Sequence, residues 1–533
     1  MSETNHESPP FMATPNGVTR REFIRTAAVA GVAIPLAGAF GNAAAIATTM
    51  PQAAAMKPLI RIGMDKPLQV VGPYTTEDKG GLGLLGQAGE YLAFFNNSFQ
   101  LEPRVAESWK ASKGSTVWTF KIRKGITFHN GKRLTANDVV ATFTKHLDPA
   151  NKSQAASALK GVVKSANIKA IDSFTVQFTL DAPLGGFPFL ISSDMYNLII
   201  LPADWQSDWT KDFIGCGPWI MEKYTIGESA TFKRNPKYWD KTRRPSFERM
   251  QCTFFDLSSK ATAQLLAGQL DVVTFIDSTD SKSLPKPKFS LQTAKTTSHL
   301  QVHMDCKTGP FADKRVRQAA ALTLDRPNII KDLLAGYGDL GNDSPMAWAY
   351  ATTDKTVSQR KRDIAKAKSL MKAAGVPNGF TVTLESFKRD DVVKLGQVIQ
   401  SSFAKIGITV KLNITEGYGY YDFAWLNSTL GITDYDHRAI PNVFLNRIFK
   451  STGDWNAAHY NNPKFDAAAD RFMKAADFAT KRAASKEIQT ILLEDTPVII
   501  VYFANTITAV NKNLTGFRTT AIGYFDAARA KVT

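Results

Sequence analysis

Alternating apolar and polar positions predict the first strands of the chain. In residues 116–123, and again in residues 173–180, every second side chain is apolar. A period of two gives a strand one buried face and one exposed face. The short apolar run 59–64 is also typical of a strand. β-Structure is therefore expected from about residue 58 onward.

Segments with helical periodicity alternate with these strands. Thr135 and Asp138 are spaced as in a capping box, which predicts a helix over residues 136–147. Further helices are expected at 258–270, 313–321, 325–334, 361–374 and 392–406, and further strands at 271–276, 380–384 and 408–412. The strand, helix and strand between residues 380 and 412 indicate a βαβ unit. The expected fold class is mixed α/β, in more than one lobe.

The N-terminus has the pattern of an export signal. Arg20 and Arg21 precede a weakly apolar run at 26–40, and small residues follow at 42–47. A basic start, a short apolar stretch and small residues at its end are typical of a cleaved signal. The run is too short and too rich in glycine for a stable membrane span. We expect residues 1–56 to be the signal and its exit segment, with cleavage within 43–55.

The twin arginines also suggest the export route. Residues 19–25, TRREFIR, resemble the twin-arginine (Tat) pattern S/T-R-R-x-F-L-K. The resemblance implies export to the periplasm and a protein that is soluble after signal cleavage. A chance arginine pair before an alanine-rich helix is the alternative interpretation.

The chain is strongly basic, with 65 Lys and Arg residues against 48 Asp and Glu residues and a formal net charge of +17. Such a charge attracts anionic ligands or surfaces. Basic residues scattered over a large surface for solubility are the more ordinary interpretation. We find no Arg-rich block with interleaved aromatic residues, so no nucleic-acid partner is expected. After the signal, no stretch has eighteen consecutive apolar residues, so no transmembrane helix is expected.

Several segments together resemble one known family. They are 101–109 (LEPRVAESW), 118–131 (WTFKIRKGITFHNG), 134–139 (LTANDV), 215–219 (GCGPW), 233–239 (KRNPKYW) and 310–319 (PFADKRVRQA). They are similar to the signature of the family 5 extracellular solute-binding proteins of ABC importers, the dipeptide, oligopeptide and nickel type. The matches extend from about residue 58 to the C-terminus.

The resemblance implies a two-lobed α/β periplasmic-binding-protein fold of the cluster C type. The first lobe would consist of residues 57–296 and 503–533, with an extra subdomain at about 91–191, and the second lobe of residues 297–502. The lobes would close on a small solute by a hinge and deliver it to a membrane permease. The protein is expected to be a monomer without catalysis of its own.

The resemblance also suggests where the solute binds. Asp434 and Tyr435 match the D-Y of a pattern in peptide-binding relatives, whose Asp binds the ligand's ammonium group, and Asp436 follows them. A carboxylate in a closing cleft is a suitable partner for an ammonium. The alternative is that Asp434 and Asp436 only shape a loop.

Two departures from that pattern change the expected chemistry of the solute. Gly431 stands where the family has Trp, and Trp425 would fill the aromatic role in a shifted register. Arg438 replaces part of an acidic-proline continuation, and an Arg suits a carboxylate or phosphate. The solute is therefore expected to be a zwitterion or an acidic conjugate. Peptides, opine-like conjugates, oligosaccharides and metal complexes all remain open.

Weaker signals predict no cofactor and no metal. Residues 81–86 satisfy G-x-G-x-x-G, but no apolar strand precedes them, so a flexible wall of the cleft is expected. His299 and His303 are four residues apart and lack a third nearby ligand, so they are expected to be partly exposed strand residues. Cys216, Cys252 and Cys306 are expected to be free thiols, because Cys252 and Cys306 fall in different lobes by analogy with the family.

Two other functions remain as alternatives. A secreted hydrolase is one, although the chain contains no G-x-S-x-G and no H-E-x-x-H motif. A triad assembled from distant segments stays open for it. The other is the same fold acting as the ligand binder of a chemoreceptor or as a chaperone.

Overall fold

The computed structural model describes residues 58–67, 70–76, 78–206, 208–416, 419–475 and 477–532. Residues from Lys57 onward form one compact unit. The predicted export signal lies outside the described residues.

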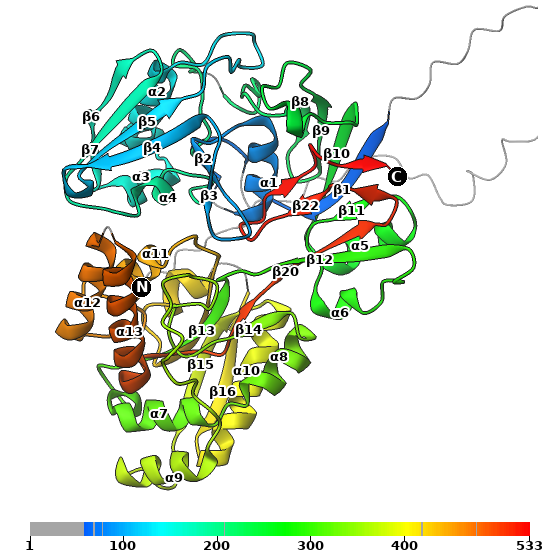
Figure 1. Ribbon diagram of the computed structural model, residues 1–533. Helices are drawn as coiled ribbons and strands as arrows, with labels where there is room; N and C mark the ends of the chain where they lie inside the picture. Colours follow the sequence, from blue (N-terminus) through cyan, green and yellow to red (C-terminus); the bar gives the residue numbers. More distant parts are fainter. Residues whose placement is uncertain are drawn as a thin grey trace, which may run out of the picture. The chain divides into compact units, whose positions relative to one another are not determined.

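A seven-stranded mixed sheet is built from the first half of the chain and one C-terminal strand (Figure 1). Its order is β12 (Phe289–Ala294), β20 (Thr506–Asn511), β11 (Val272–Val273), β1 (Leu59–Asp65), β10 (Arg249–Phe255), β9 (Ser229–Arg234) and β8 (Trp219–Thr225). The central strand β1 runs parallel to both of its neighbours, β10 and β11. Helices α1 (Lys79–Ala88), α5 (Ser258–Leu266) and α6 (Ser278–Ser281) belong to this part of the chain.

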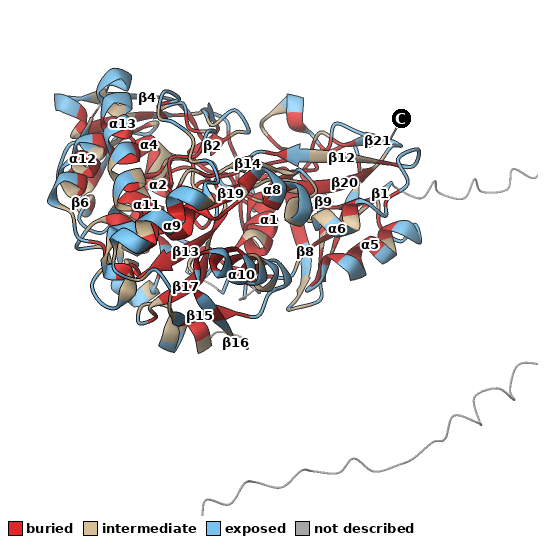
Figure 2. Ribbon diagram, turned by 90° about the horizontal axis from the view of Figure 1, so that it is seen from below, coloured by how far each residue is buried: buried red, intermediate tan, exposed pale blue. Residues whose placement is uncertain are grey.

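A five-stranded sheet is built from the second half of the chain. Its order is β16 (Thr409–Thr415), β15 (Thr381–Phe387), β17 (Leu430–Tyr435), β13 (His299–Met304) and β18 (Val498–Ile500). Strands β15 and β16 are parallel and α10 (Asp390–Phe403) connects them, which confirms the predicted βαβ unit. The remaining helices of this region are α7 (Lys314–Leu322), α8 (Arg326–Leu334), α9 (Ile364–Ala373), α11 (Asn442–Phe444), α12 (Pro463–Lys474) and α13 (Phe478–Asp495). Buried residues line the inner side of helices such as α9, α10 and α12, and exposed residues cover the outer side (Figure 2).

A four-stranded antiparallel sheet forms a third group, in the order β4 (Ala106–Ser112), β5 (Val117–Ile122), β7 (Thr175–Leu180) and β6 (Val163–Asp172). Helices α2 (Ala136–Leu147), α3 (Gln154–Leu159) and α4 (Phe187–Leu190) accompany it. Short strand pairs complete the fold: β2 (Ala93–Phe95) with β3 (Leu101–Pro103), β14 (Gly338–Leu340) with β19 (Tyr502–Ala504), β21 (Leu514–Thr515) with β24 (Lys531–Val532), and β22 (Arg518–Thr519) with β23 (Phe525–Asp526).

Most of the elements expected from periodicity are present. Helix α2 has the predicted bounds, and the Asp138 carboxylate accepts the Thr135 backbone N–H at 2.7 Å, as a capping box requires. The predicted strand at 271–276 is shorter, because only Val272 and Val273 pair with neighbouring strands. All three cysteines are free, as expected.

The interpretation of residues 81–86 as a flexible wall was wrong, because they lie in the buried helix α1. Their glycines let the helix pack closely: a Cβ on Gly86 would lie 2.7 Å from the ring of Tyr524. The expectation for the two histidines was also wrong. His299 and His303 are 3% and 0% exposed, because strand β13 is covered on both faces.

The chain crosses between the two larger sheets twice, through residues 295–298 and residues 501–505, here called the crossover segments. The two segments are hydrogen-bonded to each other. The Thr296 hydroxyl donates to the Ala504 carbonyl at 2.6 Å, and the Ala504 N–H donates to the Ser298 carbonyl at 2.9 Å.

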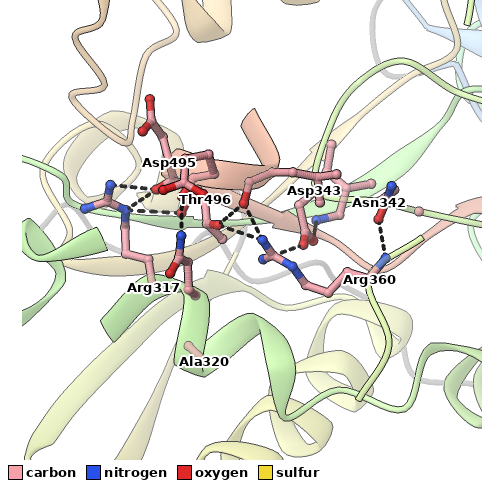
Figure 3. A network of polar contacts seen from close by, with 12 residues as sticks. Arg317, Ala320, Asn342, Asp343, Arg360, Asp495 and Thr496 are labelled. Atoms are coloured by element: carbon pink, nitrogen blue, oxygen red, sulfur yellow. Dashed lines mark hydrogen bonds and ion pairs between the residues drawn. The ribbon is translucent and has the colours of Figure 1, made fainter. Parts of the chain in front are cut away.

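A buried polar network fixes the helices around the five-stranded sheet (Figure 3). The Asp343 carboxylate forms ion pairs with Arg326 at 2.7 Å and Arg360 at 2.9 Å. Arg317 caps the end of α13 by donating to the carbonyl of Asp495 at 2.6 Å. Each buried charge therefore has a partner, which is the condition for tolerating it.

Candidate functional site

A cavity of about 330 Å³ lies where strands of the two larger sheets end. Residues from both crossover segments, Ser298, Tyr502, Ala504 and Asn505, form part of its wall. Its charged residues are Asp65, Lys79, Asp277, Arg389, Asp391, Asp434 and Asp436. The cavity wall therefore contains many charged residues and is shared between the two sheets.

Strand direction explains why these charges meet. Asp65 is the last residue of β1, and Asp277 follows β11 by a few residues. Asp434 lies at the end of β17, and Arg389 follows β15. Each of these pairs of strands is parallel. In open α/β sheets, ligands bind at the carboxyl ends of parallel strands, and the cavity follows that rule.

Asp434 is held by two neighbours inside the cavity. Arg389 forms an ion pair with Asp434 at 2.5 Å and with Asp391 at 2.7 Å, and the Tyr421 hydroxyl donates to Asp434. The Arg389 guanidinium also lies 5.1 Å from the centre of the Phe387 ring. A cation and an acceptor thus stand side by side, which is the arrangement that a zwitterionic ligand requires.

A second ion pair joins the two sides of the cavity. Lys79 from α1 contacts Asp436, which follows β17, at 3.1 Å. The pair depresses the pKa of Asp436 against the opposing effect of desolvation, and raises the pKa of Lys79. Both groups are therefore charged at neutral pH.

Asp65 has an unusual protonation equilibrium. Desolvation raises the pKa of Asp65 to about 7, with further contributions from the carboxylates of Asp78, Asp436 and Asp277, while Lys79 lowers it. Perturbed carboxyl groups in a cavity are typical of functional sites.

The residues expected from sequence divide into two groups. Asp434, Tyr435 and Asp436 line the cavity, but Trp425 and Arg438 are not part of its wall. Trp425 packs against Tyr421, with ring centres 5.6 Å apart.

Arg438 lies in a neighbouring contact region. Its guanidinium is 5.8 Å from the centre of the Tyr196 ring, and its carbonyl accepts the Tyr350 hydroxyl at 2.8 Å. Arg438 thus contacts the surroundings of the cavity and not its wall.

Sequence reasoning missed most of the charged wall, namely Asp65, Lys79, Asp277, Arg389 and Asp391. A usable signal was present for three of them, because Asp65, Asp277 and Arg389 each follow a segment predicted to be a strand. The rule that ligands meet the carboxyl ends of parallel strands would have selected them. Lys79 had no such signal, since its position depends on the packing of α1.

A second cavity, of about 630 Å³, lies beside Cys306, Arg317 and Asp495. Its main polar groups already have protein partners: the Asp495 carboxylate accepts the Tyr460 hydroxyl and the Asn462 amide, both at 2.6 Å. It is the weaker candidate for a ligand site.

Within the described ranges, no three His, Cys, Asp or Glu side chains come together as a metal site would require. Among the same residues, no helix combines the length and apolar character needed to cross a membrane.

Comparison with known proteins gives consistent matches over most of the chain. Heme-binding protein A of Haemophilus influenzae is 26% identical over 468 residues, covering 81% of this chain and 84% of that protein. Glutathione-binding protein GsiB of Escherichia coli K12 is 26% identical over 472 residues, covering 84% and 89%.

A solved structure shows the same fold. The ABC transporter substrate-binding protein CtaP of Listeria monocytogenes matches with a TM-score of 0.79 at 22% identity, over 90% of this chain and 99% of that one. The architecture is therefore the two-lobed α/β fold of periplasmic binding proteins, as expected. The family model of the bacterial extracellular solute-binding proteins, family 5, matches residues 100–454. The chain thus belongs to the family 5 extracellular solute-binding proteins, which serve ABC importers.

Proposed function

We propose that this protein is a soluble, monomeric receptor in the periplasm that captures a small polar solute in the cavity at the strand ends and delivers it to an ABC permease. The observation that carries this proposal is the cavity itself. It lies beside both crossover segments, and charged residues from both larger sheets line it. A ligand there would contact both sheets at once.

The chemistry of the wall supports a zwitterionic or cationic solute. Asp434 would accept an ammonium group, and Arg389 beside it would bind a carboxylate. Tyr435 and Asp436 complete this side of the cavity, while Trp425 and Arg438 would act indirectly. Binding without catalysis is the expected activity, so the bound solute should be recovered unchanged.

The crossover segments are the proposed hinge. With this assignment the first lobe contains residues 57–296 and 503–533, including the extra subdomain at about 91–191, and the second contains residues 297–502. The seven-stranded and four-stranded sheets then fall in the first lobe and the five-stranded sheet in the second. Two connections placed side by side allow rotation with few changes in backbone angles.

Residues 436–440, which follow β17, would hold the lobes together when they close. The Ala439 N–H donates to the Asp194 carboxylate at 2.7 Å. The His437 ring stacks on Phe95, with ring centres 5.4 Å apart. Together with the Lys79–Asp436 ion pair, these contacts support the proposal that residues 436–440 stabilise a closed arrangement.

Export through the Tat route is the proposed way to the periplasm. It rests on the arginine pair and the short apolar run of residues 1–56. Replacing Arg20 and Arg21 with lysine should leave uncleaved protein in the cytoplasm. Cell fractionation would show it, and normal export of this variant would contradict the route.

Thermal unfolding against a panel of solutes tests the binding function. A solute at about a thousand times its Kd should stabilise the protein by about 4 kcal/mol. The panel contains di- and oligopeptides, opines, sugars and metal chelates. A selective rise in Tm is expected, and no rise with any solute, after unfolding and refolding to remove a bound one, would contradict the function.

Asp434→Ala is the matched variant for the site. Removing one partner of a charged contact should weaken the binding of the solute found in the thermal panel by at least about tenfold. Trp425→Ala, outside the cavity wall, should change the affinity much less. Equal affinities for Asp434→Ala and the unmodified protein would exclude this placement of the solute.

A further inference from the structure

We propose that the solute carries a nitrogen cation, an ammonium or guanidinium group, which binds to Asp65 and Asp277 on the wall formed by the seven-stranded sheet. The inference rests on the proposed function, because it assigns the chemistry of the solute that the cavity takes. It adds a second cation subsite, separate from Asp434.

The charge of the cavity is opposite to that of the whole chain. Its wall contains five aspartates and two basic residues, a formal charge of −3 if all are ionised. The complete sequence carries +17. Acidic residues are therefore concentrated at the site, and the net charge of the protein is a poor guide to its ligand.

The acidic residues of the wall differ in their partners. Asp434 and Asp391 share Arg389, and Asp436 pairs with Lys79. By contrast, the carboxylates of Asp65 and Asp277 form no ion pair and no hydrogen bond within the part of the chain that the structure describes.

Asp65 and Asp277 lie on the same edge of one sheet. Asp65 ends β1, and Asp277 follows β11, the parallel neighbour of β1. The two carboxylates are close enough that Asp277 raises the pKa of Asp65. Asp65 is half-buried and Asp277 is exposed to the cavity. A cation between them would remove this repulsion.

Two uncharged acceptors on residues of the cavity wall also favour N–H donors. His299 is 3% exposed, and its Nδ1 donates to the Thr297 carbonyl at 2.9 Å, so Nε2 carries no proton in the neutral ring. Burial lowers the pKa of His299 to about 4, which keeps the ring neutral. Nε2 of His299 and Oδ1 of Asn505 are buried without a hydrogen-bond partner in the described residues, and both residues belong to the cavity wall.

These groups disfavour a purely anionic solute in this part of the cavity, most strongly above the pKa of Asp65. Two unpaired carboxylates and two unpaired acceptors would repel a phosphate or a second carboxylate. A guanidinium or ammonium group supplies several N–H donors and a positive charge. The group can come from a basic side chain of a peptide or from a small free amine, and the two sources share this chemistry.

Matched charged and neutral probes test the inference by isothermal titration calorimetry on the exported protein. Tripeptides containing arginine are compared with the same peptides containing citrulline, and butylguanidine is compared with butylurea. Each pair keeps the shape and removes the guanidinium charge. Tripeptides with glutamate at the same position provide an anionic series.

The cationic member of at least one pair should bind at least about tenfold more tightly than its neutral partner. Asp65→Asn and Asp277→Asn should each reduce that preference to below about threefold. Asp256→Asn is the control, because Asp256 directly follows the adjacent strand β10, pairs with Lys260 and lies outside the cavity. Asp256→Asn should keep the full preference for the cationic member of the pair.

The outcomes separate this inference from the proposed function. Neutral or anionic probes that bind as tightly as the cationic ones, or a preference unchanged in both asparagine variants, would overturn the cation subsite and leave solute binding intact. Binding only to neutral or anionic members of the wider thermal panel would do the same. If no solute of any class binds, both proposals fail.

Discussion

Asp65 gives the sharpest prediction at the scale of single residues. Its pKa is raised from an ordinary 3.8 to about 7, mainly by desolvation, so the folded protein holds the proton more tightly than the unfolded chain. The free energy of unfolding should therefore fall as pH rises from about 4 to about 7, and stay low above that range. Asp65→Asn removes this loss and should raise the stability at pH 8 by up to about 4 kcal/mol. Urea unfolding at pH 4, 6 and 8 measures the difference.

The comparison depends on a matched carboxyl group. Asp256, at the end of the neighbouring strand, is exposed and forms an ion pair with Lys260. Asp256→Asn should therefore not reproduce the pH-dependent gain. A stability difference between Asp65→Asn and the unmodified protein that is the same at pH 4 and pH 8 would contradict the raised pKa.

Individual site residues were predictable where a motif or a strand end marked them. Asp434, Tyr435 and Asp436 came from the D-Y resemblance, and all three line the cavity. Arg438 belonged to the same segment, but its side chain turns to Tyr196, which sequence spacing does not reveal. The role of Asp434, Tyr435 and Asp436 in binding stays a prediction.

At the scale of elements, the pairing of β13 with β17 depends on the small size of Gly431. Gly431 is opposite His303, and a Cβ at this position would lie 2.4 Å from a ring carbon of that buried histidine. Gly431→Ala should therefore destabilise the protein by about 1–3 kcal/mol, through overpacking between two central strands. Urea unfolding measures the loss.

Gly396→Ala is the control for this change. Gly396 lies in α10, and its Cβ would make an ordinary contact of 3.4 Å with Leu412. Alanine at this helical position should be neutral or stabilising by up to about 1 kcal/mol. Similar effects of the two substitutions would show that the His303 contact is not the cause.

Elements with strong periodicity were well predicted from sequence, and those shaped by tertiary contacts were not. The capping box and apolar spacing of α2, and the βαβ unit with α10, depend on local signals. By contrast, the glycines of α1 suggest a flexible loop in isolation, and only the packing of Tyr524 and Phe525 against them explains a helix. The π-helical segments Tyr420–Ala424 and Leu445–Phe449 also have no sequence signature.

At the scale of the whole molecule, the two-lobed fold was predictable by resemblance, because the family signatures are spread along the chain. The composition of the cavity was less accessible. It depends on which strands are parallel and which lie next to each other, and these long-range pairings join residues as distant as Asp65 and Asp434.

Closure of the proposed lobes provides the last prediction. Asp194 is 7% exposed and accepts the Ala439 N–H, so Asp194→Ala would leave that donor buried without a partner in the closed arrangement. The loss should cost the closed state about 1–3 kcal/mol and lower its population before the solute binds. The apparent Kd should then rise by about 5- to 150-fold. Small-angle X-ray scattering should show a larger radius of gyration for the ligand-free variant, and the same value as the unmodified protein at saturating solute. Asp208→Ala changes an exposed residue whose side chain contacts Thr210 and Lys211, close to it in sequence, and should leave both measurements unchanged. A weaker Kd with an unchanged radius of gyration would mean that Asp194 affects the site directly, and the proposed role of residues 436–440 in closure would then be wrong.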